Sequence, residues 1–173
     1  MAEPAHNVRP ASVSEIPLLL DIAAAAQDKL TRAGSAQQIA GYTRPNADAR
    51  VPRDEMYVLE VSGHLIGSAF VEPVTPERFP QISAWTAVPA GHSAWFLYGL
   101  VIRPSSQGSG LGRVLLDGIC RQEAFTAPAV LLLDCWAGNH RLRTFYSGAR
   151  FEFCGEFAEE DYRVAVFRRE LKE

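Results

Sequence analysis

The stretch that decides the fold is residues 95–123, which read WFLYGLVIRPSSQGSGLGRVLLDGICRQE. Its first part, Trp95 to Ile102, is aromatic and branched with almost no polar interruption, a pattern that is typical of a strand buried on both faces. Pro104 ends this strand, because proline has no N–H to donate to a strand ladder. The sequence therefore predicts a buried strand that is followed by a turn.

The last part of the stretch predicts an amphipathic helix. Small and apolar residues recur there at helical spacing, while the charged ones fall elsewhere on the wheel: Leu111, Val114, Leu115, Gly118 and Ile119. Between strand and helix lie Gly108, Gly110 and Gly112, whose missing side chains let backbone N–H groups converge. A helix N-terminus carries roughly half a positive charge and unpaired donors, so we expect an anion site here. A flexible surface turn is the plainer interpretation of the same glycines.

Two nucleotide-binding motifs do not fit this turn. A Walker loop needs Gly-Lys followed by Ser or Thr, whereas Gly112 is followed by Arg113 and Val114. A Rossmann fingerprint needs its third glycine where Arg113 stands, although Asp134 at the end of the next apolar run imitates the ribose-binding acid of that motif.

The turn instead resembles motif A of the GNAT family of N-acetyltransferases, whose signature is Gln/Arg-x-x-Gly-x-Gly/Ala. Here Val101-Ile-Arg-Pro104 is followed by Gln107-Gly-Ser-Gly110-Leu-Gly112, which places Gln107, Gly110 and Gly112 on the signature positions. A second segment, Leu133-Asp-Cys-Trp-Ala-Gly-Asn139 followed by Leu142 and Phe145-Tyr146, looks like the fifth strand of the family and the Asn-to-Tyr spacing of its fourth helix.

The rest of the chain is consistent with that resemblance. The patterns predict a strand at 7–10, a helix capped by Ser12 or Ser14, a short helix at 36–42, a hairpin at 56–61 and 65–73, strands at 129–135, 151–157 and 163–168, and a helix that ends at 147. The first helix should bury a stripe made of Leu18, Leu19, Ile22, Ala25, Ala26 and Leu30. The segment 74–94, with Phe79, Trp85 and His92, is either a functional insertion or a surface loop anchored by Trp85.

The fold class that follows is α/β (α+β) with a mixed sheet. Strands 95–102 and 129–135 must be parallel if the helix between them is a right-handed crossover, and the last two strands are close enough to be antiparallel. The same order of elements is found in the GNAT acyl-CoA N-acyltransferase fold, a central sheet of about seven strands flanked by about four helices. One position departs from the family, which usually has Gly-Phe where this chain has Arg150-Phe151. A left-handed Arg150 would cost roughly 1 kcal/mol.

Length and composition narrow the classes of function. The 173 residues predict one domain, 1–173, with a real core. A net charge of −3 gives no basic footprint for nucleic acid, and the absence of a membrane-spanning or signal pattern makes a cytoplasmic location the default. The cysteines are odd in number and lie in apolar sequence, which favours reduced core residues over a disulfide or a metal site: Cys120, Cys135 and Cys154.

The resemblance implies acetyl-CoA as the co-substrate, without a metal. The pyrophosphate would bind the turn formed by Gln107, Gly108, Ser109, Gly110, Leu111, Gly112 and Arg113, with Arg103 as a further source of charge. The pantetheine arm would pair with main-chain groups of Leu100, Val101 and Ile102, where the two parallel strands diverge, and Asn139 would hold it from the other side. A main-chain amide near Leu100 or Val101 would then face the thioester oxygen.

The resemblance also suggests catalytic roles. Tyr146 matches the usual general acid of the family, which protonates the departing thiolate; a core aromatic on an amphipathic helix is the alternative. Asp134 stands where some members carry a glutamate base, although a structural carboxylate would look the same. Weaker base candidates are Tyr98, Glu72 and His92. The acceptor entry would contain Tyr42, Trp85, Phe157 and the acidic group Glu156, Glu159, Glu160 and Asp161, either a rim for a cationic amine or a solvated turn.

Two classes of function remain open from the sequence. One is an N-acetyltransferase that moves an acetyl group to a primary amine, of a small molecule or of a peptide, by direct attack in a ternary complex. The other is a non-catalytic acyl-CoA-binding or sensor domain of the same fold. An exposed strand at either edge of the sheet leaves a homodimer open.

Overall fold

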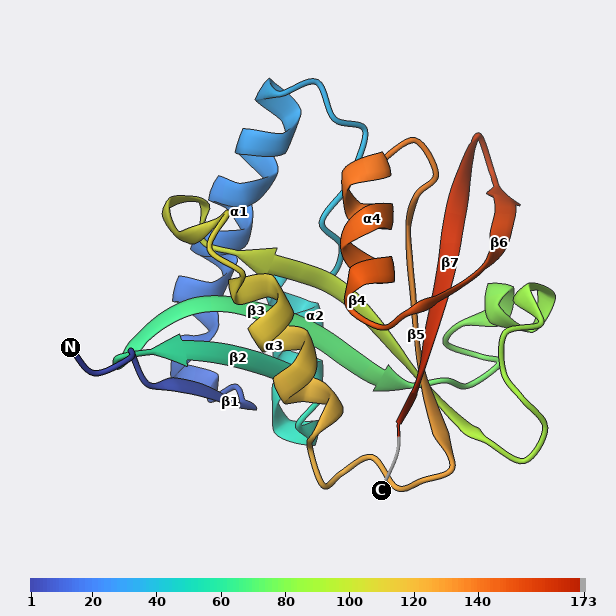
Figure 1. The fold of residues 1–173 in the computed structure, drawn as a ribbon, viewed down its shortest axis with the longest axis horizontal. Helices are drawn as coiled ribbons and strands as arrows, with labels where there is room; N and C mark the ends of the chain where they lie inside the picture. The colour runs from blue at the N-terminus through green and yellow to red at the C-terminus, as the bar shows by residue number, and fades with distance from the viewer. Residues whose placement is uncertain (172–173) are drawn as a thin grey trace. The chain divides into compact units, whose positions relative to one another are not determined.

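The computed structural model describes residues 1–171 and contains one mixed sheet with strand order β1-β2-β3-β4-β5-β7-β6 (Figure 1). The strands are β1 His6–Pro10, β2 Met56–Val61, β3 His64–Pro73, β4 Ser93–Ile102, β5 Ala129–Trp136, β6 Glu152–Glu159 and β7 Tyr162–Leu171. The helices are α1 Ile16–Arg32, α2 Arg44–Arg50, α3 Leu111–Cys120 and α4 His140–Gly148, with short 3-10 turns that include Pro80–Trp85 and Pro104–Ser106. The mixed sheet, with β4 and β5 parallel and β6 and β7 antiparallel, confirms the predicted fold class.

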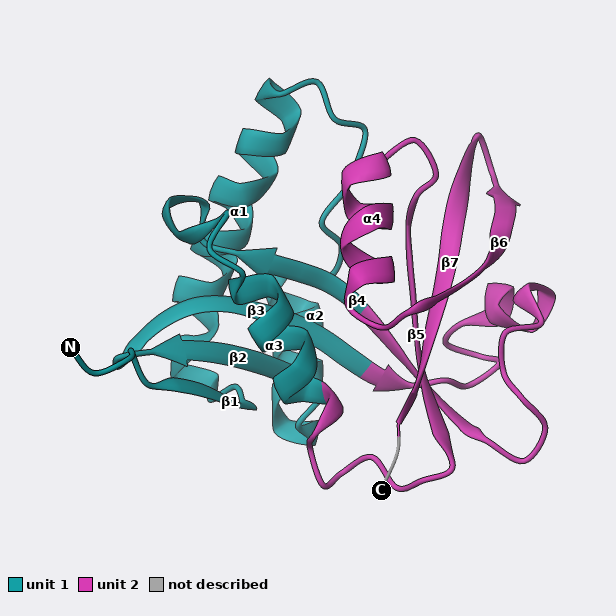
Figure 2. Ribbon diagram, in the orientation of Figure 1, with its two compact units in different colours: residues 1–71, 98–119 teal, residues 72–97, 120–173 magenta. Residues whose placement is uncertain are grey.

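The chain divides into two compact units, which Figure 2 shows in different colours. The first unit comprises residues 1–71 and 98–119, and the second comprises 72–97 and 120–173. Strand β4 contributes to both units, since its first half lies in the second unit and its second half in the first.

In the first unit, β2 is buried on both faces because a helix covers each of them. Side chains alternate along a strand, so Met56 and Val58 point to one face, where they share a core with α1. Val8 pairs with Leu59 on the other face. There α3 lies against Val8 through Gly118, where any Cβ would collide with the valine side chain. A larger residue at position 118 would therefore push α3 away from β1.

The 3-10 turn Val13–Glu15, which leads directly into α1, begins with a capping box at Ser12. The Ser12 amide donates to Glu15 Oε1 at 2.8 Å, and Arg9 Nη2 pairs with Glu15 Oε2 at 2.7 Å. This hydrogen bond with Arg9 lowers the pKa of Glu15. The predicted stripe is only partly correct, because Leu18 and Ala25 are exposed. Ala23 is buried beside Ile16, Leu19, Ile22 and Ala26, so the buried face is rotated from the predicted one.

The second helix was wrongly predicted at 36–42. The structure places α2 at Arg44–Arg50, with Thr43 as the N-cap that accepts from the Asn46 amide at 3.3 Å and with Pro45 in the first turn. Thr and Pro at these positions are the ordinary start of a helix. Gly41 has a φ of +92°, which an α-helix does not allow, so the segment before Thr43 stays irregular.

In the second unit, both faces of β5 and β7 are covered. On one face the Tyr146 ring of α4 lies 5.7 Å from the Phe167 ring. On the other face Trp85, from the 74–94 insertion, lies 5.9 Å from Phe96 and 6.5 Å from Phe157 between ring centroids. The turn after α4 places Arg150 at a φ of +68°, which confirms the expected left-handed residue.

The remaining expectations are partly met. The 95–102 strand is less buried than predicted, since Phe96, Leu97 and Val101 are buried while its other residues are half-buried. All three cysteines are free thiols, but only Cys135 is buried. Within residues 1–171, no helix combines the length and the apolar character needed to cross a membrane.

Candidate functional site

The glycine-rich turn in the first unit has the backbone that the sequence predicts. Gly108 and Gly110 have φ values of +83° and +79°. A Cβ built on either of them would meet nothing within 4 Å, so the left-handed conformation, and not crowding, requires glycine here. The turn is therefore open on the side where a ligand would approach.

A row of amides at the start of α3 has no partner in the described part of the chain. The Val114 amide, in the first turn of this helix, donates to the Gly110 carbonyl at 3.3 Å. The five amides from Gly108 to Gly112, which come before Arg113, donate no hydrogen bond within residues 1–171. Five consecutive donors at a helix N-terminus form a good site for a phosphate group.

Lys29 adds a cation to this turn that the sequence analysis did not identify. Its Nζ donates to Gln107 Oε1 at 2.7 Å, and Gln107 Nε2 donates to the Ile102 carbonyl at 3.0 Å. Gln107 thus ties the turn to both α1 and β4. The only local signal for Lys29 is a basic residue in the last turn of α1, where it also complements the helix dipole.

The two arginines that were expected to supply charge are engaged within the protein. Arg113 Nε pairs with Asp117 one helical turn later at 3.1 Å. Arg103 donates from Nε and Nη2 to the Leu65 carbonyl at 3.3 and 3.0 Å. Lys29 forms no ion pair within residues 1–171, and its partner in the turn, the Gln107 side chain, is neutral, so its charge is available to a bound anion.

Strand β4 is distorted next to the predicted thioester site. Gly99 has a φ of +65°, which is outside the range of a regular strand. Its carbonyl accepts a hydrogen bond from the Tyr42 hydroxyl at 2.7 Å. Leu100, Val101 and Ile102 follow this distortion, and Val101 is buried while its two neighbours are half-buried.

In the second unit, Asn139 has a structural role that the sequence analysis missed. Its Oδ1 accepts from the Leu142 amide at 3.0 Å, so Asn139 is the N-cap of α4. Asparagine is a preferred N-cap residue, which gave a signal for this role. The cap fixes where α4 begins and therefore where Tyr146 lies on it.

Tyr146 lies on the buried side of α4 and is 4% exposed. Its ring contacts Phe151 and Phe167, with centroids 6.0 and 5.7 Å away. No hydrogen bond holds its hydroxyl within residues 1–171. Burial, followed by the charges of Cys135 and Asp134, raises the pKa of the phenol, so it stays protonated and able to donate.

Asp134 is a largely buried carboxylate near the end of β5. Burial, and then the charge of Glu159, raises its pKa to about 7. Within residues 1–171 it forms neither a hydrogen bond nor an ion pair. A carboxylate that titrates near neutrality meets the main requirement for a general base at physiological pH.

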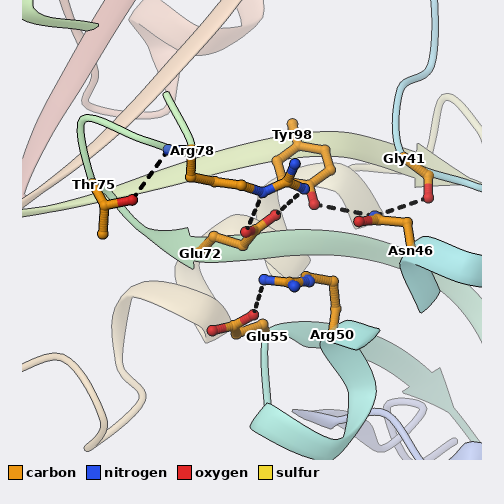
Figure 3. A network of polar contacts seen from close by, with 8 residues as sticks. All are labelled: Gly41, Asn46, Arg50, Glu55, Glu72, Thr75, Arg78 and Tyr98. Carbon is orange, nitrogen blue, oxygen red and sulfur yellow. Dashed lines mark hydrogen bonds and ion pairs between the residues drawn. The ribbon is translucent and has the colours of Figure 1, made fainter. Parts of the chain in front are cut away.

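The weaker base candidates are all engaged by neighbours. In the second unit, Glu72 accepts two hydrogen bonds from the Arg78 guanidinium, at 2.9 and 3.1 Å (Figure 3). In the first unit, the Tyr98 hydroxyl accepts from Asn46 Nδ2 at 3.2 Å (Figure 3). His92 is 3.3 Å from the Ala90 carbonyl and lines an open cavity of about 420 Å³ with residues of the 74–94 insertion.

The predicted acceptor rim is only partly accessible. Trp85 is 1% exposed and serves as the core of the insertion, while Tyr42 is bonded to Gly99. Glu156 pairs with Arg143 at 2.6 Å, and Glu160 and Asp161 are exposed in the β6–β7 turn. Glu159 is half-buried, with Oε2 bonded to the Tyr162 hydroxyl at 3.1 Å and Oε1 buried without a partner.

Comparison with solved structures identifies the fold. An acetyltransferase of the GNAT family from Streptococcus agalactiae is 18% identical, with a TM-score of 0.78 and coverage of 97% of this chain and 96% of that one. The Salmonella typhimurium acetyl transferase that modifies the N-terminal serine of ribosomal protein L7/L12 is 16% identical, with a TM-score of 0.67 over 96% and 95% of the chains. Arabidopsis thaliana Naa50, in complex with the bisubstrate analogue CoA-Ac-MVNAL, is 11% identical, with a TM-score of 0.66 and coverage of 95% of this chain and 98% of that one.

The family assignment comes from the sequence of the chain as a whole. No curated protein matches it significantly. The model of the acetyltransferase (GNAT) family, however, matches residues 22–153, which include the glycine-rich turn, Asp134 and Tyr146. This chain therefore belongs to the GNAT family of acetyltransferases.

Proposed function

We propose that this protein is an acetyl-CoA-dependent N-acetyltransferase that moves an acetyl group to a primary amine by direct attack in a ternary complex. The observation that carries the proposal is the row of five amides, Gly108 to Gly112, that have no acceptor within residues 1–171 and that lie where the sequence resembles the family motif. Residues 1–173 would form one acetyltransferase domain. No step of the proposed reaction involves a metal.

Coenzyme A binding is assigned to the first unit. The five amides would bind the pyrophosphate, and Lys29 would supply the positive charge that we had expected from Arg113 or Arg103. Main-chain groups of Leu100, Val101 and Ile102 would pair with the pantetheine arm, as the resemblance to the family implies. In the second unit, the Asn139 side-chain amide nitrogen donates no hydrogen bond within residues 1–171, because the N-cap role uses only Oδ1, and this nitrogen could bind the arm.

Proton transfer is assigned to the second unit. An aliphatic ammonium group has a pKa of about 10, so a base must take its proton before the nitrogen can attack the thioester carbon. Asp134, with a pKa of about 7, would take that proton. The C–N bond forms, the C–S bond breaks, and Tyr146 donates its phenolic proton to the thiolate. A second proton passes from the nitrogen to the Tyr146 oxygen, which restores the phenol, and Asp134 releases its proton to solvent.

The acceptor is proposed only as a class. The Salmonella enzyme modifies the N-terminal serine of a ribosomal protein, and the Naa50 complex contains a peptide linked to coenzyme A. These relatives share the fold at low identity, and they support a peptide amino group as the first acceptor to test. A small-molecule amine remains the other member of the class.

The experiment is a screen of peptides and amines for free thiol release from acetyl-CoA, followed by Tyr146→Phe on the best acceptor. The enzyme proposal expects the variant to lose most of its turnover, about 10²-fold or more, while coenzyme A affinity in calorimetry stays the same. A protein that binds coenzyme A but transfers no acetyl group to any acceptor would instead be a binding domain. No heat with coenzyme A or acetyl-CoA would refute both.

A further inference from the structure

The irregular segment before α2 is bound to β4 where that strand is distorted, within the first unit. The Tyr42 hydroxyl donates to the Gly99 carbonyl at 2.7 Å and lies 2.6 Å from Ser68 Oγ. A tyrosine hydroxyl has one proton, so the Ser68 hydroxyl must donate to the Tyr42 oxygen. Ser68 is completely buried, and burial raises the pKa of Tyr42, so both groups stay neutral and the direction of the hydrogen bonds is fixed.

Gly99 is required for this arrangement. A Cβ at position 99 would collide with the Ala40 carbonyl and lie 2.9 Å from the Tyr42 ring. The Tyr42 segment thus occupies the space that a side chain at Gly99 would need. Its place is further fixed by Asn46, which donates to the Gly41 carbonyl at 3.0 Å and to the Tyr98 hydroxyl at 3.2 Å (Figure 3).

The hydrogen bond to Gly99 also determines where the next amide points. The C=O of Gly99 and the N–H of Leu100 belong to one planar peptide unit, and the bond is trans, so the two groups point in opposite directions. Because the carbonyl points to Tyr42, the Leu100 N–H must point away from the Tyr42 segment. Without that hydrogen bond, a glycine at position 99 would allow the peptide plane to rotate.

We propose that Tyr42 and Ser68 are positioning residues, which hold the 99–100 peptide so that the Leu100 N–H is the donor for the thioester oxygen. This inference rests on the proposed function, and it selects Leu100 over Val101. Negative charge develops on that oxygen as the amine attacks, and a donor held in place before the reaction stabilises it. Both hydroxyls are engaged within the first unit, with each other and with the Gly99 carbonyl, so we expect coenzyme A binding not to depend on them.

The test compares Tyr42→Phe with Tyr57→Phe; Tyr57 is another tyrosine of the first unit and is 2% exposed. The complete loss of one oxyanion donor costs about 10²- to 10³-fold in kcat. Because Tyr42→Phe leaves the Leu100 N–H in place but no longer holds its direction, we expect kcat to fall by less, about 10- to 100-fold. The Kd for coenzyme A should not change, and Tyr57→Phe should retain kcat. Ser68→Ala keeps the bond to Gly99 and should cause a smaller loss in the same direction, which also tests the idea if Tyr42→Phe does not fold.

The carbonyl stretch of bound acetyl-CoA gives a readout that does not need an acceptor. A hydrogen bond from Leu100 lowers this frequency in the native protein, and Tyr42→Phe should return it toward the value in water-free solvent. If kcat and the carbonyl frequency of Tyr42→Phe both equal those of the native protein, the positioning role is refuted, even when acetyl transfer itself is observed. If the native protein transfers no acetyl group but the frequency responds to Tyr42→Phe, the proposed function fails while the positioning of the donor stands.

Discussion

Replacing Gly110 by alanine should separate coenzyme A binding from stability. Gly110 has a φ of +79°, and Gly34, which follows α1, has a φ of +77°. A Cβ at either position meets nothing within 4 Å, so the two substitutions introduce the same backbone strain and no collision. Each should lower the free energy of unfolding by about 1 kcal/mol. Only Gly110, however, belongs to the row of unpaired amides.

The expected loss of affinity follows from the hydrogen bonds at risk. Relief of the strain in Gly110→Ala rotates the amides of residues 110 and 111, and the new methyl group occupies the open side of the turn. A hydrogen bond to a charged phosphate contributes about 1.5–3 kcal/mol, so the loss of one bond raises the Kd for coenzyme A about 10- to 100-fold. Gly34→Ala should leave this Kd unchanged.

The assay combines calorimetry of coenzyme A binding with urea denaturation of both variants. Equal losses of stability would show that the strain is matched. If Gly110→Ala then binds coenzyme A as tightly as Gly34→Ala does, the amides at the start of α3 do not hold the pyrophosphate, and the assignment of the turn is wrong.

Three further predictions concern single side chains. Lys29→Met should raise the Kd for coenzyme A about 10-fold at low salt, because it removes the cation next to Gln107, and the effect should be smaller at high salt. An unchanged Kd in calorimetry at low salt would contradict this. Asp134 has a pKa of about 7 in the folded state and about 4 in the unfolded state, so the folded state binds an extra proton and the free energy of unfolding should fall as the pH rises from 4 to 7. Urea denaturation at several pH values should show that Asp134→Asn flattens this dependence. If the variant keeps the pH dependence of the native protein, Asp134 is not a buried carboxylate with a raised pKa. Arg150→Gly should raise the free energy of unfolding by about 0.5–1 kcal/mol, because it relieves the backbone strain of a left-handed arginine at φ +68°. A loss of stability would show that the Arg150 side chain stabilises the fold by more than this strain costs.

The parts of the fold that were predicted are those encoded in adjacent residues. The strand, turn and helix from Trp95 to Cys120 follow from apolar runs and glycine spacing, which are local signals. The helix predicted at 36–42 is wrong although its local signals were also present. The Thr43 cap and Pro45 mark the real start of α2. The stripe of α1 was misplaced because several alanines fit either face of that helix.

The parts of the site that escaped prediction depend on residues far apart in the chain. Lys29 meets Gln107 across 78 positions, and Tyr42 meets Gly99 across 57, so neither contact leaves a trace in local periodicity. The raised pKa of Asp134 likewise depends on burial and on Glu159 from another strand. The resemblance to the family suggested Asp134 and Tyr146 as candidates, but their protonation could be derived only from their surroundings.

The close approach of Gly118 to Val8 makes the orientation of α3 depend on the size of the side chains at these two positions. Since α3 carries the unpaired amides at one end and rests on β1 near the other, a methyl group at position 118 would act on the helix as a wedge and tilt it. Pairing Gly118→Ala with Val8→Ala would restore the lost space. Chains that carry a bulkier residue at one of these two places should therefore carry a smaller one at the other.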